Sequence, residues 1–199
     1  MNDLFGQLAG QLGPEIIKSI AAKIGSDETK TKSMIDMALP MITGALAKNT
    51  ETDAGAKSLE SALNAKHDGS VLDSLSDLIS NPDAGEGAGI LKHLLGEKEV
   101  EVEKAIAEKT GTNPEQSNQI LKVLAPMVLG AIGKEKKVGG LDISQIVGMI
   151  GDANKKMEDP NNSMMMSLAT AFLDKDKDGD IKDDLLNMGM KAVSGFFKK

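Results

Sequence analysis

Apolar residues follow one another at intervals of three and four along most of the chain. This 3.6-residue period is that of an α-helix with one buried face. The clearest series are Leu4, Phe5, Leu8 and Leu12; Ile16, Ile17, Ile20 and Ile24; and Leu72, Leu75, Leu78 and Ile79. The alternation typical of a strand is approached only in Glu99–Glu103, which falls opposite the helical segment at Glu15 when the chain is aligned with itself. The predicted fold class is therefore all-α.

The chain matches itself at a shift of 86 positions, so that residues 4–48 superimpose on residues 90–134 without a gap. The identical pairs include Ile20/Ile106, Ala21/Ala107, Gly25/Gly111, Pro40/Pro126, Met41/Met127, Gly44/Gly130 and Ala45/Ala131. Spacing held over so long a stretch predicts two copies of one unit, neither of which buries its apolar face alone. We therefore predict an internally duplicated multi-helix bundle.

Glycines and small polar residues mark the expected helix ends. Gly25 and Gly111 are placed to end helices in the left-handed conformation, which glycine adopts without a steric penalty. Ser26 and Thr112 follow at once and are predicted to cap the next helices. Glu115, three residues after Thr112, gives that cap the spacing of a capping box.

Prolines fall inside the second helix of each copy. Pro40 and Pro126 each remove a backbone donor and clash with the preceding turn, so they are predicted to kink the helix or to start a new one. The small residues that follow, Gly44 and Gly130 among them, offer a face on which another helix could pack closely.

The chain is expected to have three parts. Residues 1–151 form the duplicated body, in which each copy is followed by a short helix and Asn81–Gly89 is a Pro/Gly-rich connection between the copies. Residues 152–162 are predicted to be a linker. Residues 163–199 read as a helix, an acidic loop and a second helix.

The acidic loop is the strongest candidate site. Five aspartates are predicted to bind a metal ion: Asp174, Asp176, Asp178, Asp180 and Asp184. Carboxylates at alternate positions before the turn at Gly179 supply the oxygens that Ca²⁺ prefers, so the segment resembles an EF-hand loop. Leu185 stands where that loop has a bidentate Glu, so the expected affinity is weak, on the order of 10⁻⁴–10⁻³ M. The alternative is a solvated turn whose charges are screened by neighbouring lysines.

Composition excludes several other functions. The net charge is −7, no Arg occurs and aromatic residues make up 2%, which disfavours nucleic-acid binding. There is no Cys, so thiolate metal sites and cysteine nucleophiles are absent from the chain. The longest apolar stretches, Met37–Ala47 and Val123–Gly133, are shorter than the roughly 20 residues that span a bilayer, which predicts buried core helices. Without a visible signal peptide, the expected location is cytoplasmic and membrane association is not expected.

The remaining polar candidates favour structural roles. His67 and His93 have no second histidine nearby in the sequence, so each is expected to be a surface or structural residue. The run Gly85–Gly89 lacks the strand and the lysine–hydroxyl pair of a phosphate-binding loop, which favours a linker. No nucleophile has a base at a motif spacing. The chain is therefore expected not to be an enzyme, and no small-molecule substrate is indicated.

The repeated Pro-Met and Gly-Ala pairs, together with Asp68–Leu72 and Gly89–Gly96, resemble the YidB-like family of bacterial proteins of unknown function. The acidic segment Asp178–Leu185 is similar to the tail of longer members of that family. The resemblance implies an all-helical bundle from a bacterium and carries no catalytic residue. The leading hypothesis is a non-enzymatic protein whose calcium-binding tail is ordered by the ion. The alternative is a helical protein-interaction or self-assembly module in which metal is incidental.

Overall fold

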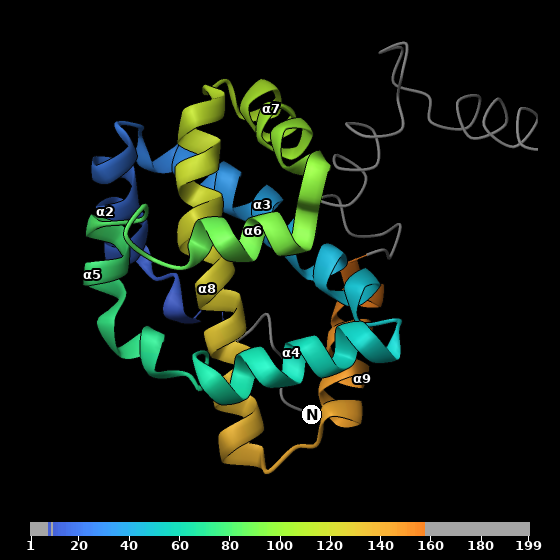
Figure 1. Ribbon diagram of the computed structural model, residues 1–199. Helices are drawn as coiled ribbons and strands as arrows, with labels where there is room; N and C mark the ends of the chain where they lie inside the picture. The colour runs from blue at the N-terminus through green and yellow to red at the C-terminus, as the bar shows by residue number, and fades with distance from the viewer. Residues whose placement is uncertain (1–7, 9, 158–199) are drawn as a thin grey trace, which may run out of the picture. The chain divides into compact units, whose positions relative to one another are not determined.

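The computed structural model describes residue 8 and residues 10–157, and every regular element in these residues is a helix (Figure 1). In chain order they are α2 (Pro14–Ile24), α3 (Glu28–Asn49), α4 (Asp53–Ala65), η1 (Ser70–Ser74), α5 (Leu75–Ser80), α6 (Gly87–Leu95), η2 (Gly96–Lys98), α7 (Glu99–Thr110), α8 (Pro114–Gly139) and α9 (Ile143–Met157). The all-α prediction is confirmed for this part of the chain. The predicted acidic loop, with its helices, lies outside the described residues.

Helix α8 forms the centre of the bundle. Its residues 123–133 are buried without interruption, so neighbouring elements surround it on every side. Helices α3, α6 and α7 pack along it, and Figure 1 shows α6 and α4 crossing in front of it. The prediction that Val123–Gly133 is a buried core helix is confirmed. The apolar residues of α8 thus supply one wall for most of the other helices.

Neither internal proline starts a new helix, because α3 runs through Pro40 and α8 runs through Pro126. Proline at 126 leaves the carbonyl of Lys122 without its usual donor one turn later. The backbone of Gly87 lies against that carbonyl, so closely that a Cβ at Gly87 would be 2.1 Å from the Lys122 oxygen. Helix α8 nevertheless continues through the proline, with the backbone of α6 packed against the carbonyl that has lost its donor.

The N-caps lie one residue later than predicted. The Asp27 side chain accepts a hydrogen bond from the Lys30 N–H at 2.8 Å. Asn113 and Gln116 form a capping box, with bonds of 2.9 Å and 3.2 Å between each side chain and the other residue's N–H. The prediction of Ser26 and Thr112 is wrong because their N–H groups bond to Ala21 and Ala107 and so belong to the end of the preceding helix.

Equivalent positions of the two predicted copies have similar local structure. Gly25 and Gly111, which end α2 and α7, have φ of 66° and 64° and donate their N–H groups to the carbonyls of Ala21 and Ala107. Helices α3 and α8 begin 86 positions apart, at Glu28 and Pro114. The predicted left-handed glycine ends are confirmed, whereas the duplication stays a prediction.

The small faces of the two long helices are covered from the opposite half of the chain. A Cβ at Gly44 of α3 would lie 3.3 Å from the Asn154 side chain of α9. A Cβ at Gly130 of α8 would lie 2.4 Å from Val71 of η1. The segment after each predicted copy therefore packs on the long helix of the other copy.

Two predicted connections are shorter than expected. Helix α6 begins at Gly87, so the connection predicted over Asn81–Gly89 ends at Glu86. Gly87 packs against α8, where only glycine leaves room for the Lys122 carbonyl. Helix α9 extends to Met157, and the boundary of the first compact unit of the chain lies directly after this residue. Residues 152–157 of the predicted linker are therefore helical, and the rest of it lies outside the described residues.

Candidate functional site

A cavity of about 410 Å³ lies among α3, α4, α6 and α8. Its floor is made of residues that are buried in the fold: Leu46, Thr50, Leu59, His67 and Leu129. Its mouth is made of exposed residues of α4, of the residue that follows it, and of α6 with its N-cap: Ser58, Lys66, Glu86, Gly89 and His93. A volume of this size suits a small ligand, and the floor is mainly aliphatic.

Helices α4 and α6 form the two edges of the pocket's opening. Ser58, early in the α4 segment, meets His93, late in α6, whereas Lys66 after α4 meets Glu86 before α6. The two segments therefore run antiparallel, and only side chains bridge the mouth at its ends. Glu86 and His93 are seven residues apart, so the mouth is about 10 Å long at the rise of an α-helix.

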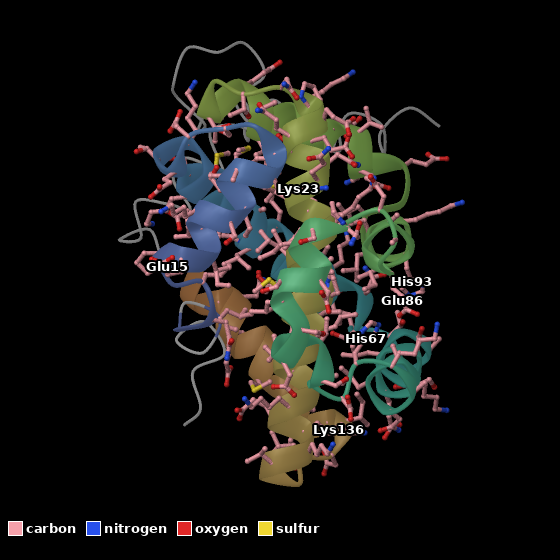
Figure 2. All side chains as sticks on the ribbon, turned by 90° about the vertical axis from the view of Figure 1, so that its left-hand side faces the viewer. Glu15, Lys23, His67, Glu86, His93 and Lys136 are labelled. Carbon is pink, nitrogen blue, oxygen red and sulfur yellow. The ribbon has the colours of Figure 1, made fainter. Side chains whose placement is uncertain are left out.

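One end of the pocket holds a three-residue polar cluster. Glu86 pairs with Lys66 through Oε1, and its Oε2 lies 3.5 Å from Nε2 of His67. Burial lowers the pKa of His67, an effect that the Glu86 carboxylate opposes and the Lys66 charge reinforces. The imidazole is therefore neutral at physiological pH. Figure 2 shows His67, Glu86 and His93 on the same side of the molecule.

The tight packing of the chain around His67 explains why its imidazole lies in the floor. The residue follows the end of α4 and is 7% exposed. Its backbone carbonyl lies so close to α8 that a Cβ at Gly133 would be 1.6 Å from the His67 oxygen. Glycine on α8 thus lets the chain approach closely enough to place the imidazole beside the cavity.

The other end of the pocket is less polar. Nε2 of His93 lies 3.5 Å from the Ser58 hydroxyl, at the outer limit of a hydrogen bond. Below this contact, the Asn49 amide donates to the carbonyls of Leu94 at 3.1 Å and Ala45 at 2.8 Å. Asn49 therefore ties the end of α6 to α3 and holds this end of the pocket in place.

The sequence did not predict this pocket. Both histidines of the chain lie in the lining of the pocket. His67 and His93 are 26 positions apart, and the tertiary fold alone brings them to one cavity. The expectation of a surface or structural role agrees with the burial of His67 and the exposure of His93. The number of histidines and their spacing in the sequence gave no signal of this placement.

The predicted metal ligands Asp174, Asp176, Asp178, Asp180 and Asp184 all lie outside the described residues. Within the described ranges, no group of three or more His, Asp or Glu side chains is arranged to hold a metal ion. Calcium binding by the acidic run stays a prediction.

Residues 6–135 match the model of a family described as "Bacterial protein of unknown function (DUF937)". The chain belongs to this family. The family region extends from before α2 to the last turns of α8 and includes every residue that lines the pocket. The finer resemblance to YidB-like proteins stays a prediction, as does the acidic tail, which the family region does not reach. Neither curated proteins nor solved structures yield a match to this chain.

Among the residues that the structure describes, no helix combines the length and the apolar character needed to cross a bilayer. This finding agrees with the short apolar stretches seen in the sequence.

Proposed function

We propose that this protein is a non-enzymatic binding protein whose pocket between α4 and α6 holds the apolar part of a small ligand. The observation that carries the proposal is the cavity of about 410 Å³ with a buried aliphatic floor and a polar mouth. Ligand sites in proteins have this form: apolar walls supply the binding energy, and a few polar groups orient the ligand. The position of the pocket inside the family region supports assigning it to the domain rather than to an appended segment.

The polar groups of the pocket support binding more than catalysis. A nucleophilic serine needs a base within hydrogen-bond reach, held in turn by a third group. The Ser58–His93 contact is long at 3.5 Å, and no carboxylate contacts His93 within the described part of the chain. Nε2 of the other imidazole, His67, faces Glu86 rather than a hydroxyl. These contacts favour a role for both histidines in lining the pocket rather than in activating a nucleophile.

Filling the pocket from α6 tests the proposal. A Cβ at Gly89 meets nothing within 4 Å, so Gly89→Leu extends a side chain into the mouth without strain on the backbone. We expect the neutral fluorescent probe N-phenyl-1-naphthylamine to bind the natural protein and to bind the variant about tenfold or more weakly. Fluorescence titration measures both affinities.

Gly148→Leu is the matched control for this variant. Gly148 is an exposed residue of α9, also has nothing within 4 Å of its Cβ position, and is not part of the pocket. The control should bind the probe as the natural protein does. Absence of probe binding by the natural protein, or equal binding by both variants, would contradict the proposal.

Calcium binding is a second, separate proposal that rests on the acidic run alone. Alternating aspartates from Asp174 to Asp180 give oxygen ligands at the spacing that Ca²⁺ uses, with Asp184 as the nearest acid to replace the missing Glu. Isothermal titration with millimolar calcium should release or absorb heat, and Asp176→Ala should lose that signal. The absence of a heat signal from the natural protein would contradict the proposal of calcium binding.

The predicted duplication supports the view that residues of one chain suffice to build the helical body that holds the pocket. Because η1 and α9 each cover the glycine face of the opposite long helix, two copies that shield each other account for the arrangement. The alternative of a self-assembly module rests on these same faces at Gly44 and Gly130 and on the methionine-rich tail, which lies outside the described residues. Both faces are covered from within the chain, so we do not base self-association on them.

A further inference from the structure

The charges around the pocket cancel. The residues that line it include one lysine and one carboxylate, Lys66 and Glu86, and these pair with each other across the mouth. Burial lowers the pKa of the His67 imidazole in the floor, so this group is uncharged as well. The lysine and the carboxylate of the lining therefore present no net charge to a ligand that enters the pocket.

This cancellation penalises an ionic ligand. An anion that approaches Lys66 is repelled by the neighbouring Glu86, and a cation that approaches Glu86 is repelled by Lys66. Either ion therefore gains little net attraction from the pair, while its own charge loses water against the aliphatic floor. Both side chains of the pair are partly exposed, so the cost comes mainly from the ion's lost hydration.

An uncharged ligand avoids this cost. A hydroxyl group both donates and accepts hydrogen bonds, so it can bond to the Glu86 carboxylate or the His67 imidazole without breaking the Lys66 pair. Its aliphatic chain can lie along the floor of the pocket, below a mouth about 10 Å long. The pocket offers such a ligand apolar contact and a hydrogen-bonding partner together.

Resting on the function proposed above, we infer that the ligand is an uncharged aliphatic amphiphile, and that the Lys66–Glu86 pair selects against anions and cations. The pair is a specificity device rather than a source of affinity, because an exposed ion pair contributes little stability by itself.

Three ligands with the same chain and different head groups test this inference. 1-Octanol is neutral, whereas octanoate and octylammonium carry opposite charges at neutral pH. We expect octanol to displace N-phenyl-1-naphthylamine at about one tenth of the concentration that either ion needs, since a buried polar group left without a partner costs about tenfold in affinity. Octanoate or octylammonium displacing the probe as well as octanol does would overturn the inference.

Two single variants test the role of the pair. Glu86→Gln leaves the charge of Lys66 unpaired and should improve octanoate binding relative to octylammonium by about tenfold. Lys66→Gln leaves Glu86 unpaired and should shift the preference by a similar factor toward octylammonium. Gln keeps the approximate length of both side chains, and thermal melting checks that each variant is folded.

The outcomes separate the two proposals. Probe binding without displacement by any octyl ligand, or unchanged preferences in both charge variants, would overturn the ligand class and leave the binding function standing. Failure of the natural protein to bind the probe at all would overturn the binding function and the inference that rests on it.

Discussion

Gly133→Ala is expected to destabilise the protein by about 3 kcal/mol. An ideal Cβ at this position would lie 1.6 Å from the carbonyl oxygen of His67 and 2.7 Å from its carbonyl carbon. Both neighbours are backbone atoms, which cannot rotate away as the end of a flexible side chain does. Helix α8 and the segment after α4 must therefore separate, at the cost of their apolar contacts. Urea denaturation followed by circular dichroism measures the loss.

Gly148→Ala provides the control for that substitution. Gly148 is also in the interior of a helix, α9, and its Cβ position has nothing within 4 Å. Alanine has the higher helix propensity, so this variant should gain about 0.5–1 kcal/mol. Similar stabilities of the two variants would show that the approach of His67 to α8 is looser than the structure describes.

Val128→Ala is expected to cost about 2 kcal/mol. Val128 is completely buried in the central stretch of α8, with 0% of its surface exposed. Removing its two γ-methyl groups loses their burial and leaves a space that closely packed neighbours cannot fill. The same denaturation experiment measures this effect, with the midpoint expected to move to lower urea concentration at an unchanged slope.

Val138→Ala, on the same helix, is the matched control for the buried valine. Its side chain is 77% exposed, so the identical chemical change removes almost no buried surface. The higher helix propensity of alanine should make this variant as stable as the natural protein or slightly more stable. A large loss at Val138, or no loss at Val128, would contradict the central position of α8 in the fold.

These substitutions test one feature, the role of α8 as both core and pocket wall. Leu129 of this helix lies in the pocket floor, and Gly133 lets the chain bring His67 to the same floor. The binding site thus depends on packing that also stabilises the bundle. For this reason the binding tests use Gly89, Lys66 and Glu86, which lie at the mouth and away from this packing.

The helices and most of their ends could be predicted from the sequence because their causes are local. The 3.6-residue period of Ile16, Ile20 and Ile24 requires only a helix with one buried side, and α2 has it. Gly25 and Gly111 end their helices in the left-handed conformation as expected, since that conformation depends on the residue's own lack of a Cβ. Even the error of one residue at the N-caps was local, between neighbouring polar residues.

The pocket and the close packing on α8 depend on contacts between residues far apart in the chain. Helix α8 continues through Pro126, and Gly87 of another helix packs against the Lys122 carbonyl that proline leaves without its donor. Lys66 and Glu86 pair only after α4 and α6 have come to lie across α8. A periodic pattern indicates which side of a helix is buried but not which helix covers it. The local elements therefore followed from residue order, whereas the site arose from packing between them.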